Sequence, residues 1–494
     1  MQLIDIKLDY NHLAYFDTVL QECLHQQSNQ TMIQELSQNS PVTWICDFGV
    51  LSYNLKSWRD IFPQVQPLFS LRYSKFGVSP LVKNLGVGFT CSNKRDLLSA
   101  GNSGVKTRNV VFDGENQPKS SLKAAVAQNC VVAANNEKDL KQIESFGAVN
   151  SRVIVKVSWN KNEEYYKSIL DCAAKKNINV LGIGCDVSAC SNEAEIEQIF
   201  NRTIVAMKYA ESLGCAIEFL NLGGLSTADS DNSFKDQHVA KINSMLESKI
   251  FEIWPKLTVI ADASDWLMSE VLKVVVTVSK SCGDKGVCSI TDSVYGSFSG
   301  LMQYSEYRMS EPWALRPGAS ECDENLKKEF TILGCVGDDL DALSGKFWMP
   351  ANLTEGDKIV FDSMEKFISN ATLESIQFNA LEEPKIEAVI HRGYLNLAKD
   401  LKCKEFQLKG SSSPAVQSEN RNLNAVMTEL IESISLVEQD QVNNRRNPLA
   451  AEMGNIAALV SFEEATSMQM MLMDQIELRN QQQELLDGLH FSCL

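Results

Sequence analysis

The sequence predicts an α/β barrel followed by a second, mainly β domain. From Val42 to residue 271, apolar β-like runs alternate with segments whose apolar residues recur with a period near 3.6. Such alternation implies a parallel sheet, and this many repeats favours a closed (β/α)8 barrel. After Leu272 the predicted strands follow one another without helices between them, which indicates a β-sandwich or small β-barrel.

The expected strands are short and apolar. In the first domain they are Val42–Ile45, Leu68–Leu71, Gly86–Phe89, Val110–Phe112, Val131–Ala133, Val153–Val157, Val180–Ile183, Phe219–Leu222 and Val259–Ala261. In the second domain they are Val274–Val278, Lys358–Phe361 and Lys385–His391. Between the barrel strands, Glu193–Leu213 and Phe234–Ile253 are clear helical segments.

Composition changes again at both ends of the chain. The first 41 residues are polar and rich in Gln and Asn, with a helix expected at Tyr15–Gln26, and are predicted to pack on the β domain. Beyond Asp400, the run Gly410–Pro414 is typical of a linker, and amphipathic helices are expected at Leu423–Leu436 and Leu449–Leu486. The predicted division is therefore 1–41, 42–271, 272–400 and a tail of 401–494.

Charge and cysteine usage limit the classes of partner. The net charge of -17 disfavours nucleic acid and anionic membranes. No run of about 18 apolar residues suggests a membrane span, and Met1–Asp5 lacks the pattern of a signal peptide. The 14 cysteines form no paired CxxC set, so reduced thiols without a metal, in a cytoplasmic protein, are expected.

One short motif follows the predicted strand Val287–Ile290. The stretch Thr291–Phe298 places Tyr295 and Gly296 in a turn, where glycine permits a close backbone approach and tyrosine offers a flat face with a polar tip. The stretch resembles the Asp-Gly-Val-Tyr-Gly-Ser-Phe element of the ornithine decarboxylase family, whose fold-type III enzymes use pyridoxal phosphate. Ser293 replaces the first glycine of that element.

Further strings match the same family in the same order, between Val42 and Ile390. They are Cys46–Gly49, Val87–Ser92, Gly182–Val187, Leu220–Gly224, Gly334–Asp341 and Glu355–Asp357. The resemblance implies a pyridoxal-phosphate-binding type of (β/α)8 barrel with a β domain, and active sites shared across a dimer.

Pyridoxal phosphate catalysis needs a lysine for the Schiff base, a carboxylate for the pyridine nitrogen, and amides with an arginine for the phosphate. The family lysine ends a Phe-Tyr-Ala-Val-Lys string, and the nearest match runs from Leu71 to Lys75. The resemblance thus places Lys75 at the Schiff-base position, and the alternative is that Lys75 is a surface lysine. The family's Ala-Glu-Pro-Gly-Arg motif corresponds to Ala261–Asp265, so Asp262 is a shortened carboxylate and Asp265 replaces the phosphate-binding Arg.

Other cofactor positions also differ from the family. The glycine loop becomes Gly223, Gly224 and Leu225, whose Cβ would intrude on a phosphate. The remaining changed positions in the barrel are Asp186 for a stacking His, Ala189 for a phosphate-contacting Ser, Thr90 for an Asp beside the lysine, and Lys156 for an Arg.

In the second domain the resemblance assigns further site positions. The catalytic Cys reads as Gly337, with Cys335 two residues away, whereas Asp338 is retained. Phe367 replaces a cofactor-contacting Tyr, and the substrate-binding Asp falls on Tyr304 or Ser305.

These losses predict a non-catalytic homologue of the antizyme-inhibitor type, without a cofactor. The resemblance implies that it would regulate polyamine synthesis, and thus putrescine, by competing for antizyme, the regulator that dissociates the decarboxylase dimer. The expected contact region is Gln117–Leu140, with Lys119, Lys123 and Lys138; the alternative is an ordinary solvated helix face. Two further readings stay open: a pyridoxal-phosphate decarboxylase of altered specificity, and an inactive subunit that pairs with an active decarboxylase paralogue or with itself.

Overall fold

The computed structural model describes most of the chain before residue 390. The described residues are 27–102, 105–114, 118–146, 151–158, 161–225, 232–302, 309–315, 327–343, 345–368, 376 and 381–389. The expected helix at Tyr15–Gln26, the linker Gly410–Pro414 and the helices of the tail all lie outside the described residues, as do Tyr304 and Ser305.

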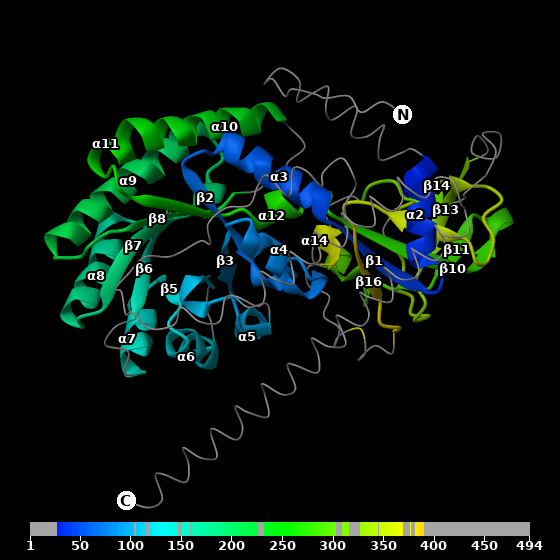
Figure 1. The fold of residues 1–494 in the computed structure, drawn as a ribbon, viewed down its shortest axis with the longest axis horizontal. Helices are drawn as coiled ribbons and strands as arrows, with labels where there is room; N and C mark the ends of the chain where they lie inside the picture. The colour runs from blue at the N-terminus through cyan, green and yellow to red at the C-terminus, as the bar shows by residue number, and fades with distance from the viewer. Residues whose placement is uncertain are drawn as a thin grey trace, which may run out of the picture. The chain divides into compact units, whose positions relative to one another are not determined.

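Eight parallel strands close the predicted barrel (Figure 1). In barrel order they are β2 (Val65–Ser70), β3 (Gly88–Cys91), β4 (Val110–Phe112), β5 (Val131–Ala134), β6 (Arg152–Val157), β7 (Asn179–Cys185), β8 (Phe219–Gly224) and β9 (Thr258–Asp262). The barrel closes where β2 pairs with β9, with Val65 opposite Val259. The predicted fold class, a barrel with a second β domain, is confirmed.

Helices connect these strands and cover the outside of the barrel (Figure 1). They are α4 (Ser79–Asn84), α5 (Lys94–Asn102), α6 (Lys119–Ala127), α7 (Glu137–Ser145), α8 (Glu163–Lys175), α9 (Glu193–Ser212), α10 (Asn232–Met245), the π-helical η5 (Leu246–Ile250), α11 (Phe251–Ile253) and α12 (Ser264–Met268). Short 3-10 turns follow β2 (η2, Leu71–Phe76), precede β4 (η3, Thr107–Asn109) and follow β7 (η4, Val187–Ala189).

Local sequence explains where three of the helices begin. Asn136, Asn162 and Asn192 are the N-caps of α7, α8 and α9, and each side chain accepts a hydrogen bond from the backbone amide three residues later. This contact satisfies one of the amides that a helix start leaves without a partner. A separate cluster of buried side chains from the barrel strands packs together. Its members are Leu68, Val111, Val131, Ile154, Leu181, Phe219 and Ile260.

The second domain is a mixed sheet of eight strands, in which some neighbours pair antiparallel and others parallel. Its order is β12 (Trp313–Leu315), β15 (Lys358–Phe361), β10 (Leu272–Cys282), β11 (Val287–Ile290), β13 (Lys327–Leu333) and β14 (Phe347–Pro350), with β1 (Val42–Asp47) and β16 (Lys385–Val389) attached through β10. Helix α2 (Gln27–Ser37) packs on this sheet through Ile33, which shares a buried cluster with Val275 and Val360.

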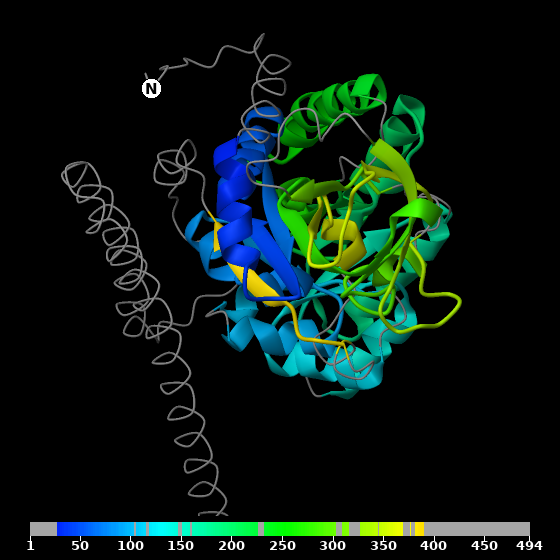
Figure 2. The same ribbon diagram turned by 90° about the vertical axis from the view of Figure 1, so that its right-hand side faces the viewer.

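The position of β1 differs from the prediction of a barrel beginning at Val42. Strand β1 pairs antiparallel with β10 and parallel with β16, so it belongs to the second sheet, and the barrel begins at Val65 (Figure 2). Helix α3 (Phe48–Ile61) then leads back to the barrel, where Trp58 meets Trp266 edge-on at 5.8 Å between ring centroids. All six residues of β1 are buried, so its apolar run does not distinguish the two sheets.

Aromatic side chains connect the barrel to the β domain. Ring centroids follow one another from Phe69 to Tyr73 (5.7 Å), from Tyr73 to Phe76 (6.3 Å) and from Phe76 to Trp44 of β1 (5.5 Å). The Trp44 indole N–H donates to Ser297 Oγ at 2.7 Å. Because these side chains are buried, η2 is held between the two domains.

No helix among the described residues combines the length and hydrophobicity needed to cross a bilayer.

We predict that Gly182→Ala destabilises the barrel. A Cβ on Gly182 of β7 would lie 2.6 Å from the Phe219 carbonyl oxygen of β8, and this neighbour is backbone in a closed barrel. We expect a loss of about 1–3 kcal/mol in the free energy of unfolding, measured by urea denaturation. Gly224→Ala is the matched control, because a Cβ there meets nothing within 4 Å. Equal urea midpoints for both variants would contradict the prediction.

Candidate functional site

The carboxyl ends of the barrel strands bring together several of the residues singled out in the sequence. In barrels of this kind the active site lies at this end. Asp186 follows β7, Gly223 and Gly224 end β8, and Asp262 ends β9. Asp265 follows in the first turn of α12. The mouth of the barrel is therefore the candidate site.

Arg72 is the cation that reaches this carboxylate cluster. Its Nη2 lies 2.7 Å from Asp265 Oδ1 and donates to the Tyr73 hydroxyl at 3.0 Å. The Arg72 and Asp265 side chains are 38% and 39% exposed, so the ion pair faces the mouth. Arg72 Nε is buried and has no hydrogen-bond partner among the described atoms. The ion pair joins the end of β2 to the start of α12.

Lys75, the expected Schiff-base position, lies in the last turn of η2, after the end of β2. Its Nζ donates to the Ile368 carbonyl oxygen at 2.8 Å and sits 5.1 Å and 5.9 Å from the ring centroids of Phe76 and Trp44. Burial lowers the pKa of Lys75 to about 7, with Asp96 opposing and Arg72 adding to the effect. The ammonium is thus directed to the β domain, whereas the guanidinium of Arg72 is directed to the aspartates.

The register of β2 explains this difference. The strand ends at Ser70, so Leu68–Arg72 is the segment that leads from the strand into the mouth. In this segment Phe69 is aromatic, Ser70 is small, Leu71 is apolar and Arg72 is cationic, which is the same order of residue types as in the string Tyr-Ala-Val-Lys. Sequence reasoning did not single out Arg72, because it searched for a lysine.

The Asp262 side chain is hydrogen-bonded to the turn that follows β9. Its Oδ1 accepts hydrogen bonds from the Ser264 backbone amide at 2.9 Å and from the Ser264 hydroxyl. Ser264 Oγ in turn accepts from the Ser70 amide at 2.7 Å, which links β9 to β2. Burial raises the pKa of Asp262, while the Ser264 hydrogen bonds and Arg72 lower it. This carboxylate therefore stabilises the strand-to-helix turn.

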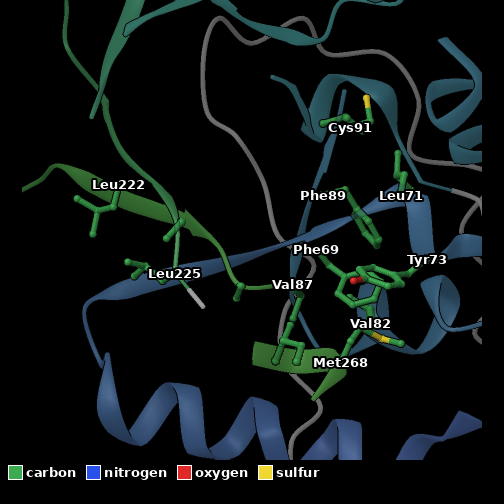
Figure 3. Packing of buried hydrophobic residues seen from close by; sticks show 14 of the residues in the cluster. Phe69, Leu71, Tyr73, Val82, Val87, Phe89, Cys91, Leu222, Leu225 and Met268 are labelled. Atoms are coloured by element: carbon green, nitrogen blue, oxygen red, sulfur yellow. The ribbon is translucent and has the colours of Figure 1, made fainter. Parts of the chain in front are cut away.

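The glycine loop uses its backbone amides within the barrel. The Gly223 amide, with φ of +77°, donates to Asn221 Oδ1 at 3.0 Å. The Leu225 amide donates to the Asp262 carbonyl oxygen at 2.9 Å. The Leu225 side chain is buried beside Leu222 (Figure 3). Two amides of this loop are thus already hydrogen-bonded to protein atoms.

A second ion pair crosses the mouth. Lys156 at the end of β6 lies 2.9 Å from Asp113, which follows β4, and both side chains are less than one-fifth exposed. Asp186 accepts a hydrogen bond from the Ser188 hydroxyl at 2.6 Å. Thr90 is buried at the β3 end, and Ala189 is exposed in η4.

The turn Thr291–Phe298 of the second domain is built on two buried carboxylates. Asp292 Oδ1 accepts from the backbone amides of Ser293 (2.8 Å) and Ser297 (3.1 Å). Asp341 accepts from the Ser293 hydroxyl at 2.8 Å, the Val294 amide at 3.0 Å and, through its other oxygen, the Val336 amide at 2.9 Å. Because carboxylates bond several amides at once, the turn and the segment 334–341, here called the acidic loop, form one rigid unit.

The acidic loop carries the remaining expected site residues. Asp338 accepts from the Tyr295 hydroxyl at 2.7 Å and from the Leu340 amide at 3.0 Å, and these bonds, the amide first, lower its pKa. Cys335 is exposed, but burial of its thiol and nearby carboxylates raise the pKa to about 11, which disfavours the thiolate. Gly337 adopts a φ of +77°.

Phe367 is 4% exposed and packs in the core, with the backbone of Gly300 as a neighbour. It lies in the short helix α14 (Glu365–Ile368), beside the chain that leaves the barrel.

A cleft lies elsewhere, on the outer wall of the barrel. It has a volume of about 650 Å³ between α8 and α9. Its acidic side chains are already ion-paired, Glu163 with Lys167 and Glu197 with Lys241, so it offers little free charge. Among the described residues, no group of His, Cys, Asp and Glu side chains is arranged to hold a metal ion.

Comparisons with known proteins agree with this architecture. A family model described as "Pyridoxal-dependent decarboxylase, pyridoxal binding domain" matches residues 49–265. Antizyme inhibitor 1 of Pongo abelii is 22% identical over 379 residues, covering 69% of this chain and 81% of that protein. A probable ornithine decarboxylase of Dictyostelium discoideum is 20% identical over 377 residues, covering 69% and 78%.

Solved structures show the same fold. The arginine decarboxylase of Paramecium bursaria Chlorella virus has a TM-score of 0.62 at 19% identity, covering 74% of this chain and 100% of that one. The lysine/ornithine decarboxylase of Vibrio vulnificus, solved with putrescine, has a TM-score of 0.62 at 18% identity, covering 74% and 99%. Residues 49–265 thus match the pyridoxal binding domain of the pyridoxal-dependent decarboxylases, the chain is similar to antizyme inhibitors and ornithine decarboxylases, and it has the fold of the fold-type III pyridoxal phosphate decarboxylases.

Proposed function

We propose that this chain is a non-catalytic member of the family that binds antizyme, as an antizyme inhibitor does. The observation that carries the proposal is the Arg72–Asp265 ion pair at the mouth of the barrel. In the register of β2, Arg72 takes the place of the Schiff-base lysine, and Asp265 takes the place of the phosphate-binding arginine.

The chemistry of a guanidinium supports this reading. Arginine stays protonated at any pH that proteins tolerate, so Arg72 offers no free amine to form a Schiff base. Asp265 engages the Arg72 guanidinium, so this cation is not left for a phosphate group, and Asp262 is occupied by Ser264. The residues present therefore do not fit pyridoxal phosphate.

The glycine loop supports the same conclusion independently. Amides that bind a phosphate must point to it without a prior partner. The amides of Gly223 and Leu225 are bonded to Asn221 and Asp262 instead. Restoring one charge would leave these amides engaged, so the loss has several separate causes.

The expected partner surface is available on the outside of the barrel. Lys119, Lys123 and Lys138, on α6 and α7, are exposed. Lys119 lies 5.8 Å from the ring centroid of Phe146, whereas neighbouring Lys141 is paired with Glu137. Helix α6 contains no acidic residue, so the three exposed lysines present positive charge that a negatively charged partner could approach.

The curated relatives include antizyme inhibitors from several vertebrates. Their names supply the partner that the lysine surface alone does not identify. Ornithine decarboxylases occur among the relatives too, so the argument against catalysis rests on the barrel mouth. A cytoplasmic location and a homodimer remain expectations taken from the sequence.

A second candidate function is an inactive subunit that pairs with an active decarboxylase. The acidic loop favours it, because Val336 and Leu340 are 43% and 76% exposed on a segment that Asp341 and Asp338 hold rigid. A preorganised loop with exposed aliphatic side chains is suited to contact another protein.

We predict that pyridoxal phosphate does not bind specifically. Titration of the purified protein, followed by absorbance, should give no saturable aldimine band, because Arg72 cannot form one and its charge is engaged by Asp265 instead of a phosphate. Arg72→Lys should not gain ornithine decarboxylase activity, since Asp265 and the engaged amides remain. An active ornithine decarboxylase serves as the positive control. A saturable band that Lys75→Ala abolishes would show that Lys75 forms a Schiff base.

We predict that reversing the charge of Lys119 and Lys123 weakens binding to antizyme. The two residues lie four apart on α6 and share one helix face. The double variant Lys119→Glu, Lys123→Glu should lose about 1–3 kcal/mol of binding free energy, mainly through slower association, measured by titration at two salt concentrations. Folding should change little because both side chains are exposed.

The matched control reverses two exposed lysines on another part of the barrel, Lys208 of α9 and Lys256 before β9. It makes the same change in net charge. Equal weakening by both double variants would point to a non-specific charge effect, and no binding by the unaltered protein would favour the inactive-subunit function.

A further inference from the structure

Glu365 is a buried acid at the point where the chain leaves the barrel for the β domain. It begins α14, which lies between the barrel and the sheet strands (Figure 1). The side chain is 7% exposed. Its Oε1 accepts a hydrogen bond from the Glu270 amide at 3.3 Å, and its Oε2 is buried without a hydrogen-bond partner.

The Glu365 contact falls on a strained residue. Glu270 connects α12 to β10 and has a φ of +60°, a left-handed conformation that is uncommon outside glycine. Its amide is directed to Glu365. The segment in which the chain passes from the barrel to the β domain is therefore hydrogen-bonded, through Glu270, to a carboxyl group on α14.

Helix α14 packs on α12 and on the 3-10 turn η7 (Ser299–Met302). Asp265 is the charged residue of α12, and η7 has no titratable side chain. Further charged and titratable groups lie near Glu365. Tyr73 lies on the η2 side, Glu270 at the crossover and Lys366 on α14 itself, and the opposite end of the helix holds Lys75 through the Ile368 carbonyl oxygen. Glu365 forms no ion pair with a described residue. A buried carboxylate without a counter-ion is costly, whereas a neutral carboxylic acid is not.

We propose that Glu365 is a proton switch at the barrel–sheet crossover: it is a neutral acid while α14 packs against η2 and Glu270, and release of its proton loosens this packing. The proposal concerns α14 and its neighbours, and stands apart from antizyme binding and from the barrel mouth.

The direction of the pH effect follows from burial. Burial raises the pKa of Glu365 to about 7, against partial lowering by backbone hydrogen bonds. In the unfolded chain a glutamate has a pKa of about 4.3. The folded chain therefore holds the proton more tightly, so this contribution to stability is complete below the unfolded pKa and is lost as the pH rises through 7. Between pH 6 and pH 8 the loss amounts to about tenfold in the folding equilibrium.

Lys75 works in the opposite direction over the same range. Its lowered pKa means that the folded chain holds that proton less tightly, so its contribution to stability increases from pH 7 upward. The two effects offset each other in the unaltered protein. The comparison that isolates Glu365 is the stability of Glu365→Gln relative to the unaltered protein, because Lys75 is common to both.

The test uses the full chain and two measurements. Urea denaturation at pH 6, 7 and 8 should show that the folding equilibrium of Glu365→Gln, divided by that of the unaltered protein, rises about tenfold from pH 6 to pH 8. Glu355→Gln, which removes an exposed glutamate of the same domain, should give a constant ratio. A constant ratio for Glu365→Gln as well would overturn the proposal.

Infrared difference spectroscopy provides the second measurement. The unaltered protein should show a protonated-carboxyl band that disappears with a midpoint near pH 7, and Glu365→Asp should shift both the band and its midpoint. This variant keeps the acid, so the test remains decisive if Glu365→Gln does not fold. A carboxyl spectrum that is unchanged between pH 6 and pH 8 would overturn the proposal.

Discussion

The proposed function depends on one interaction, the ion pair between Arg72 and Asp265. In an enzyme that uses pyridoxal phosphate, the barrel mouth must leave a cation and several amides for the cofactor. Here the charges of Arg72 and Asp265 neutralise each other within the protein, and so do the charges of Lys156 and Asp113. The ion pair is two-fifths exposed, so it contributes only about 0–1 kcal/mol to stability; its importance is that it occupies the charges.

The packing around the mouth explains how the barrel and the β domain are held together. From Phe69 through Tyr73 and Phe76, aromatic contacts run to Trp44 in the second sheet, and Trp44 is bonded to Ser297 in the turn of the β domain. These contacts are made by side chains and require no ligand. The two domains therefore hold the outer helices and the acidic loop in fixed positions, which is the condition for recognition by another protein.

The sequence predicts the barrel well because its strands are buried on both faces and are visible as apolar runs between helical segments. It cannot assign Val42–Asp47 to a sheet, since nine such runs compete for eight places and only the pairing with β10 and β16 decides. It cannot distinguish Arg72 from Lys75, because the last residue of β2 is set by its neighbours β3 and β9. It gives no reason to single out Glu365, whose burial depends on the packing of α14 against distant elements.

Electrostatics decides whether an acidic chain can present a basic binding surface. The net charge of -17 produces a long-range repulsion toward a negatively charged partner. At physiological ionic strength that field is screened beyond about 8 Å, so only charges close to the contact act strongly. Many of the acidic side chains on the barrel wall are already matched, as Glu137 is with Lys141 and Glu144 with Lys176. Because α6 has no acidic residue, Lys119 and Lys123 have no carboxylate within their own helix to neutralise them. The overall charge therefore slows a distant encounter, while the local charge determines the contact once the two surfaces are near.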